Sequence, residues 1–366
     1  KYDLIVFGLL DSHTTTGGTA TTRLDHYVYT RQSIEQARRL LKEGGVVVLS
    51  FEGLPHVADR IHGTLEQVFG HPPKSFTIPA SELGWGGTMF VTGDLDAVDA
   101  QVAAHPSVAA QLDAWQVENP GKFTGRYTIT TDDWPYLYLD HPRIPWLFYL
   151  MAGLMLLLFV RGRWTLSREQ KFVRWTANHW HFFFLGAAFM LLEVQNITKA
   201  AVVLGSTWQV NAVIVSGVLT MVLCANVIAA TFRRLPRTPV YVALWLTCVG
   251  LYFVDFSWFG TLPYLWKALA VGAIATSPMI FSGIVFVESL VKVQHKDQAF
   301  GANMFGALVG GLLQWTTFLT GMKFLLVLVV VLYALAFVTR PAADSEEQPS
   351  DEPAPDDAQK LAVETP

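Results

Sequence analysis

The stretch HFFFLGAAFMLLEVQNITKAAVVL, residues 181–204, decides the fold class, because it is almost entirely apolar and long enough to cross a membrane. Similar apolar segments precede and follow it, joined by short loops. A membrane-spanning helix needs about 20 apolar residues, within a range of about 17 to 25. By this measure the sequence predicts a transmembrane bundle in residues 144–340, with about seven helices at 144–160, 181–204, 209–232, 238–256, 263–291, 299–319 and 322–339.

The composition of the whole chain agrees with a membrane protein. Of its 366 residues, 52% are hydrophobic and only 15% are charged, whereas soluble domains average about 25% charged residues. Residues 1–140 have an ordinary soluble composition, which indicates a separate domain ahead of the bundle. The net charge of −4 combines an acidic C-terminal region with basic loops, so no nucleic-acid partner is expected. Cys224 and Cys248 lie in apolar segments and offer neither a disulfide framework nor a zinc site.

Residues 1–95 predict a small α/β domain. Short apolar runs suit buried parallel strands, and amphipathic stretches between them suit helices. The predicted order is strand Asp3–Phe7, helix Ser33–Lys42, strand Val46–Phe51, helix Val57–Phe69, strand Phe76–Ile78 and strand Thr88–Thr92. Ser33 is the expected N-cap of the first helix, and Gly44-Gly45 its expected end. This order is what the C-terminal half of a doubly wound sheet gives, and residues 96–143 are predicted to be a linker and membrane-proximal segment.

Two stretches of this domain, KYDLIVFGLLDS (1–12) and LDHYVYTRQSIEQARRLLKEGGVVVLSF (24–51), resemble the second half of the spermidine synthase family. That family is a branch of the Rossmann-like methyltransferases. TTDDWPYLYL (130–139), residues 182–213 and GANMFGALVGGLL (301–313) are similar to multi-pass bacterial membrane proteins that carry a spermidine synthase-like domain. The resemblance implies a Rossmann-like methyltransferase half-domain followed by an all-α polytopic bundle, in the inner (plasma) membrane of a bacterium.

The resemblance also implies a chemistry. It implies S-adenosylmethionine or its decarboxylated form as cofactor, and a polyamine or a lipid-like molecule as acceptor. The glycine-rich loop that holds this cofactor would precede Lys1, so we expect the chain to be part of a longer protein. Aminopropyltransferases carry two aspartates after the strand that corresponds to Asp3–Phe7 here. The second is matched by Asp11, whereas the position of the general base is Gly8, which has no proton acceptor.

Asp11 is therefore the candidate catalytic residue. It follows a strand, where open α/β sheets bind ligands, and it can hold an ammonium group or a ribose hydroxyl. The alternative is a turn aspartate bonded to its own backbone. His13, His26 and Tyr27 follow in the same loop, and they either line the same cleft or belong to ordinary loop surface.

Asp132-Asp133-Trp134 resembles a paired-carboxylate site for a metal or a polyamine. The motif lies just ahead of the first apolar segment and is rich in Trp and Tyr, which favour the membrane–water boundary. An interfacial collar that links the soluble domain to the lipid is therefore the preferred interpretation.

Polar residues inside the apolar segments are the other candidates. Glu193, Asn196 and Lys199 recur at a spacing of three. Ionisable groups at membrane depth face a bundle interior or a wet cavity, so Glu193 and Lys199 either neutralise each other or bind a cationic substrate. Ala302, Gly306 and Gly310 recur every four residues. Such a face lets another helix approach closely, within the chain or in a homo-oligomer.

Basic residues occupy alternate loops of the bundle: Arg161, Arg163, Arg168, Lys171, Arg174, then Arg233, Arg234, Arg237, then Lys292 and Lys296. The positive-inside tendency places these loops in the cytoplasm, together with the acidic tail 341–366, which we expect to be disordered. If every segment crosses the membrane, residues 1–143 then lie outside the cytoplasm, where S-adenosyl cofactors are not expected. Alternatively, 144–160 does not cross.

Three functions follow from these observations. The first is a membrane-bound S-adenosyl-dependent transferase, with aminopropyl transfer in polyamine biosynthesis implied by the resemblance. The second is a polytopic transporter whose soluble domain senses or binds a ligand. The third is a membrane scaffold with a catalytically degenerate domain. Gly8 and the charge-derived topology argue against the first, and no second complete catalytic set is present in the sequence.

Overall fold

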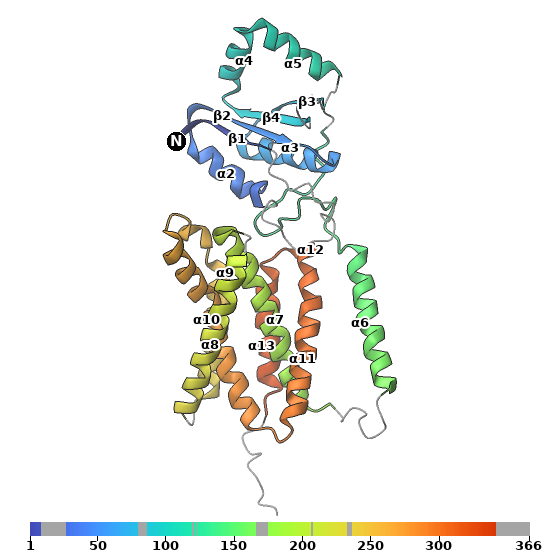
Figure 1. Cartoon of the computed structure of the whole chain (residues 1–366), viewed down its shortest axis with the longest axis vertical. Coiled ribbons are helices and arrows are strands. Elements are labelled where there is room, and N and C mark those ends of the chain that lie inside the picture. Colours follow the sequence, from blue (N-terminus) through green and yellow to red (C-terminus); the bar gives the residue numbers. More distant parts are fainter. Residues whose placement is uncertain are drawn as a thin grey trace, which may run out of the picture.

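The computed structural model describes residues 1–8, 27–79, 86–118, 121, 123–165, 175–205, 208–232 and 236–341. These residues form a small α/β domain at one end of an elongated molecule and a helical bundle at the other (Figure 1). The predicted class is confirmed in this coarse form: most of the described chain is helical, with one small mixed sheet. Residues 342–366 of the predicted acidic tail lie outside the described part.

The sheet has four strands in the order β1 (Tyr2–Phe7), β2 (Leu41–Phe51), β4 (Gly87–Gly93) and β3 (Lys74–Ile78). β1 and β2 are parallel, and the other two pairs are antiparallel. This is the strand and helix order that the apolar runs predict. The parallel pair is joined through α2 (Arg31–Leu40), so α2 begins at the edge of the sheet where β1 and β2 end.

Two helices cover one face of this sheet. α2 contributes Ile34, and α3 (Pro55–Phe69) contributes Val57, Ile61 and Leu65, to a core with Leu49 and Phe51 of β2 and Phe90 of β4. Burying such side chains contributes about 1.5–3 kcal/mol each relative to exposure. At the sheet edge, by contrast, Tyr2, Leu4 and Val6 of β1 are more than half exposed.

Two details of the predicted boundaries are wrong. Thr30, and not Ser33, is the N-cap of α2, because its Oγ1 accepts a hydrogen bond from the Ser33 backbone N–H. Gly44 and Gly45 do not end this helix, since β2 already begins at the buried Leu41. The predicted linker also contains two helices, α4 (Leu95–Ala103) and α5 (Pro106–Glu118). α4 has no buried residue, so no apolar periodicity marks it.

Each of the seven apolar segments contains a helix. Their bounds are α6 Trp146–Thr165, α7 Ala177–Leu204, α8 Trp208–Thr231, α9 Arg237–Phe253, α10 Tyr264–Val291, α11 Lys296–Leu313 and α13 Phe324–Val338, with the short α12 Thr317–Thr320 before α13. By length and composition α7, α8 and α10 can cross a membrane, and 146–161 and α13 are shorter apolar helices. Seven crossings therefore stay a prediction.

α7 is the central helix of the bundle and lies against α8, α10, α11 and α13. The small-residue face of α11 packs on it: a Cβ at Gly306 would meet the carbonyl oxygen of Phe183, and one at Gly310 that of Ala187. Ala302, on the same face, is also buried. This face is thus already covered within the chain, and a homo-oligomer through it stays a prediction.

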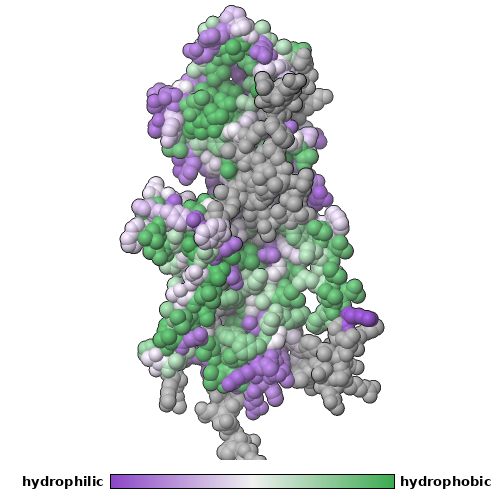
Figure 2. Space-filling model, in the orientation of Figure 1, coloured by the Kyte–Doolittle hydropathy of each residue, from purple (hydrophilic) through white to green (hydrophobic). Residues whose placement is uncertain are grey.

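α6 stands apart from the other helices in Figure 1. Its rings contact α11 and the segment before α13, where Phe148 lies 4.9 Å from Trp315 and Phe159 lies 5.2 Å from Phe305 between ring centroids. Most of its other apolar side chains are exposed, including Leu154, Leu157 and Leu158. Hydrophobic residues cover the visible face of the bundle in Figure 2, and hydrophilic residues gather at its end away from the soluble domain.

Candidate functional site

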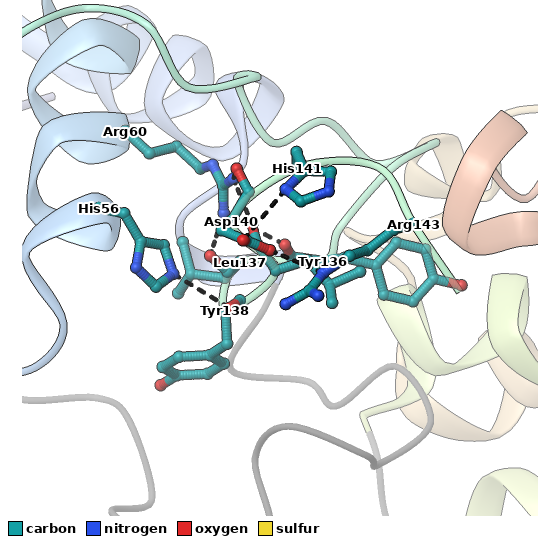
Figure 3. A network of polar contacts seen from close by, with 9 residues as sticks. His56, Arg60, Tyr136, Leu137, Tyr138, Asp140, His141 and Arg143 are labelled. Atoms are coloured by element: carbon teal, nitrogen blue, oxygen red, sulfur yellow. Dashed lines mark hydrogen bonds and ion pairs between the residues drawn. The ribbon is translucent and has the colours of Figure 1, made fainter. Parts of the chain in front are cut away.

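A connector, defined here as residues 123–143, joins the soluble domain to the bundle. Arg60 of α3 holds it by donating hydrogen bonds to five of its carbonyl oxygens, those of Thr128 (2.6 Å), Tyr136 (3.3 Å), Leu137, Leu139 and Asp140 (3.4 Å). Figure 3 shows Arg60 against the 136–140 stretch of the connector. Only 1% of the Arg60 side chain is exposed. Burial lowers its pKa to about 10, which leaves the guanidinium charged at neutral pH. The arginine therefore fixes the path of the connector under the sheet.

The same connector is bonded to the bundle. Trp134 Nε1 donates to the carbonyl oxygen of Phe318 (2.9 Å), and the Tyr136 hydroxyl lies 2.5 Å from that of Thr317. Asp133 accepts from the backbone N–H of Lys323 through its carboxylate (2.7 Å), at the start of α13. Trp134 and Tyr136, which we interpreted as a collar facing the lipid, are buried between the two parts of the protein.

A cavity of about 190 Å³, here called the junction cavity, lies between the connector, the start of α2 and the bundle. It opens into a wider hollow of about 580 Å³ with which it shares Tyr27, Gln32, Asp132 and Asp255. Since α2 begins where the parallel strands end, Tyr27 and Gln32 place the cavity at the carboxyl edge of the β1–β2 pair. Open α/β sheets bind their ligands at this edge.

Carboxylates from both parts of the protein face the junction cavity. Asp132 comes from the connector, and Asp255 from the loop between α9 and α10. Asp132 Oδ1 accepts a hydrogen bond from Thr30 (2.6 Å), and Asp255 Oδ1 accepts from the Ser257 N–H (2.9 Å). Burial raises the pKa of Asp132 despite the Thr30 bond, and the charges of Asp255 and Glu35 raise it further. A cation between these carboxylates would relieve that repulsion.

Two lysines and several aromatic rings complete the lining. Lys199 Nζ donates to the carbonyl oxygen of Leu251 (2.7 Å) and lies 5.9 Å from the Phe256 ring centroid. Lys323 Nζ lies 5.7 Å from the ring centroid of Tyr252. The walls therefore combine carboxylates with aromatic faces, the groups that recognise organic ammonium ions, and the lysines limit the net negative charge.

The structure brings together some of the predicted site residues. Tyr27 and Lys199 both line the junction cavity, together with Asp132 and Asp133 of the connector motif. Tyr27 is buried there, and burial, followed by the charges of Tyr136 and Asp132, raises its pKa. Asp11, His13 and His26 lie outside the described residues. Gly8 directly follows β1, and a Cβ built on it would meet no atom within 4 Å.

Glu193 is not part of this site. It does not line the junction cavity, and within the described part of the chain no ion pair joins it to Lys199. The two residues point about 120° apart around α7, because each residue turns the helix by about 100° and six residues separate them. They therefore do not neutralise each other, and a cation path lined by both side chains would have to bend around the helix.

The sequence gives little warning of two lining residues, Asp255 and Lys323. Each is a single charged residue in a loop between apolar segments, where a charge ordinarily only meets water. What could have marked Asp255 is its place among rings, in FVDFSWF (253–259). Lys323 could have been noticed only because it lies in one of the loops opposite to the basic ones, where the positive-inside tendency predicts few basic residues.

The described residues contain no group of three His, Cys, Asp or Glu side chains placed to hold a metal ion. The described residues also contain no Gly-x-Gly loop that follows a strand and opens a helix. No protein-family model, curated protein or solved structure matches the chain.

Proposed function

We propose that this chain is a membrane protein that binds a small organic amine in the junction cavity. The observation that carries the proposal is the meeting of Asp132 and Asp255, one from each part of the protein, across a cavity with aromatic walls. A protonated amine matches both features, through charge-assisted hydrogen bonds to the carboxylates and cation–π contact with the rings. Its site at the carboxyl edge of the parallel strands agrees with the resemblance to spermidine synthases.

The resemblance implies that the bound amine takes part in a group-transfer reaction. In that reading the amine is the acceptor in an S-adenosyl-dependent reaction, such as aminopropyl transfer, and the domain is tethered to the membrane. The parallel β1–β2 pair and the loop after β1, which carries Asp11, favour it. The described carboxylates at the cavity are the groups that could accept the proton that the bound ammonium group must lose before transfer.

A second use is ligand sensing or transport by the bundle. The observation that favours it is a set of buried polar groups on α7 below the cavity: the side-chain nitrogen and oxygen of Gln195, and Nδ2 of Asn196, have no hydrogen-bond partner among the described residues. Such groups are costly in a membrane interior, and they mark ion and substrate paths. Of the two uses, ligand sensing or transport requires fewer features of the soluble domain, because it needs no catalytic base.

Binding is the first thing to test. Protein purified in detergent is titrated calorimetrically with putrescine, with spermidine and with 1,4-butanediol, the neutral counterpart of putrescine. We expect the amines to bind and the diol not to. Asp132→Asn and Asp255→Asn keep the hydrogen-bond acceptors but remove the charge, so each should weaken amine binding by about tenfold or more. Asp96→Asn, on the exposed face of α4, is the matched control and should change nothing.

Turnover then separates the two uses. The protein is incubated with S-adenosylmethionine or its decarboxylated form and the amine that binds best, and the nucleoside product is identified by mass spectrometry. Methylthioadenosine indicates aminopropyl transfer, and S-adenosylhomocysteine indicates methyl transfer. Binding without either product supports sensing or transport, for which uptake of the labelled amine into proteoliposomes is the direct assay. If the amines bind no better than the diol, the proposed function is wrong.

A further inference from the structure

A second polar pocket lies at the end of the bundle away from the soluble domain, and we call it the basic pocket. Arg237 is the first residue of α9, Lys292 directly follows α10, and Arg340 lies two residues beyond α13. All three line the pocket, and its other residues include Tyr241, Glu288 and Ser289. Three helix ends thus bring three cations to one place, and among the described residues that line the pocket only Glu288 is a carboxylate.

The local charge is therefore positive. Burial lowers the pKa of Lys292, and the charge of Arg237 lowers it further, whereas Glu288 raises it. The N-terminal end of α9, at Arg237, adds the positive end of a helix dipole on the same side. An anion bound here would offset part of the repulsion between Arg237 and Lys292.

Two donors in the basic pocket lack a partner. Nη1 of Arg340 and the hydroxyl of Tyr241 are buried and make no hydrogen bond within the described part of the chain, and the Tyr241 side chain is only 2% exposed. Arg340 is held in place by the Phe337 ring, whose centroid lies 4.0 Å from its guanidinium carbon. Because an unmet buried donor costs about 1–3 kcal/mol, a ligand with several acceptor oxygens is the natural complement.

We propose that the basic pocket binds a phosphate group, and that this phosphate is the headgroup of an anionic membrane lipid. The enclosed space of about 10 Å³ has room for about one water-sized atom, so one phosphate oxygen can reach the two buried donors while the rest of the phosphate lies at the mouth, among the three cations. Val291 and Val338, the last residues of α10 and α13, are more than 70% exposed beside Lys292 and Arg340. They offer an apolar surface on which the acyl chains can lie.

The membrane position of the pocket favours a lipid over a free ion. It lies at the basic end of the bundle, which the positive-inside tendency assigns to the cytoplasmic leaflet, where anionic lipids attract basic residues. The pocket is also tied to the core, because Ser289 bonds His181 Nε2 (2.8 Å), and His181 Nδ1 lies 2.7 Å from the carbonyl oxygen of Ala336. A lipid that joins these helix ends should therefore stabilise α7, α10 and α13 together.

The test measures the unfolding temperature of the full chain in neutral detergent while phosphatidylglycerol, phosphatidylcholine or inorganic phosphate is added. We expect a saturable rise with phosphatidylglycerol, since a ligand that binds only the folded state raises its stability, and no comparable rise with phosphatidylcholine. Arg340→Gln should increase the half-saturating phosphatidylglycerol concentration by about tenfold. Tyr241→Phe keeps the packing of the ring and should increase it less. Lys296→Gln, at the same end but outside the pocket, is the control and should leave it unchanged.

The three added compounds and the variants distinguish the outcomes. If inorganic phosphate reproduces the rise at similar concentrations, the phosphate site stands and its assignment to a lipid is wrong. An equal rise with both lipids would overturn the proposal, as would equal effects of Arg340→Gln and Lys296→Gln. Should Arg340→Gln fail to fold, Tyr241→Phe decides: an unchanged half-saturating concentration in that variant also overturns the proposal.

Discussion

At the scale of single residues, the attachment of the soluble domain depends on Arg60. Its buried guanidinium donates hydrogen bonds to carbonyl oxygens of the connector, including those of Thr128, Leu137 and Leu139. Arg60→Met preserves much of the side-chain length but leaves these oxygens unmet. We expect a loss of about 3–5 kcal/mol in the stability of the domain, measured as a lower unfolding temperature and as faster proteolytic cleavage within the connector.

Two further variants interpret that result. Arg60→Lys retains the charge but not the planar fork of donors, and it should fall between wild type and Arg60→Met. Arg126→Met removes an exposed arginine of the same connector and should be neutral. If Arg60→Met and Arg126→Met behave alike, the connector is held by other contacts.

Asp132 makes amine binding depend on pH. Its pKa is raised in the folded protein, chiefly by burial, so part of the carboxyl population is protonated above the ordinary range of an aspartate, near pH 4. The ionised form binds the ammonium group, whereas alkyl amines stay protonated up to about pH 10. Putrescine affinity should therefore rise as the pH rises from about 4 through the raised pKa, and then level off.

The same shift predicts the opposite trend for the protein without ligand. Since the folded state holds this proton more tightly than the unfolded state, Asp132 makes folding less favourable as the pH rises through that window. Calorimetric titration at several pH values checks the affinity, and Asp132→Asn should remove the part of the pH dependence that belongs to this carboxyl. A rise in affinity that persists unchanged in Asp132→Asn would assign it to another group.

The sequence identifies only part of the candidate site at this scale. Tyr27 follows from the resemblance, and Lys199 from its rarity inside an apolar segment. Asp132 is visible as a paired carboxylate, but its neighbours favour a lipid-facing collar, because Trp and Tyr look alike in a sequence whether they face lipid or protein. Asp255 could not be predicted, since its meeting with Asp132 depends on how the bundle docks on the connector.

At the scale of elements, adjacent glycines of α11 allow a controlled test of helix packing. A Cβ at Gly310 would lie 2.6 Å from the carbonyl oxygen of Ala187 on α7, whereas one at Gly311 would meet no atom within 4 Å. Both changes to alanine gain about 1 kcal/mol of helix propensity. We expect Gly311→Ala to raise the unfolding temperature slightly, and Gly310→Ala to lower it by the equivalent of about 1–3 kcal/mol.

The difference between these variants isolates the contact of α11 with α7. Equal effects would mean that α7 and α11 do not approach closely at Gly310. The size of any homo-oligomer should be the same for both variants if the face serves packing within the chain. Loss of an oligomer in Gly310→Ala alone, without loss of stability, would instead favour the contact between chains.

Elements are predictable from the sequence where burial imposes a period. The apolar segments and the β-α-β-α-β-β order follow from runs that must be buried, and the structure contains helices or strands at each of them. α4 and α5 escape because their packing on the sheet is slight: α4 buries no residue, and α5 is anchored through the stacking of Trp115 on Phe76. A helix that buries few side chains shows little apolar periodicity in its sequence.

At the scale of the whole molecule, contacts that do not involve α6 place the soluble domain at the end of the bundle opposite the basic pocket. Asp133 of the connector bonds Lys323 at the start of α13, and Arg340 lies just beyond its end, in the basic pocket. On α7, Lys199 at the junction cavity and His181 near the basic pocket are about 27 Å apart by helical rise, close to the thickness of a bilayer core. The domain and the basic end therefore lie on opposite sides of the bundle, whether or not 144–160 crosses.

Because the soluble domain and the basic end lie at opposite ends of the bundle, labelling each end from outside the cell tests the proposed functions. With Cys224 and Cys248 replaced by alanine, Asp96→Cys on α4 should react with a membrane-impermeant maleimide in intact cells, whereas Lys296→Cys at the basic end should react only after the cells are permeabilised. That result would place the junction cavity outside the cytoplasm, where an S-adenosyl cofactor is not expected, and would favour amine sensing or transport. The reverse labelling would give the domain access to cytoplasmic cofactors and favour transfer. Labelling of both cysteines from one side would contradict the arrangement of the two ends itself.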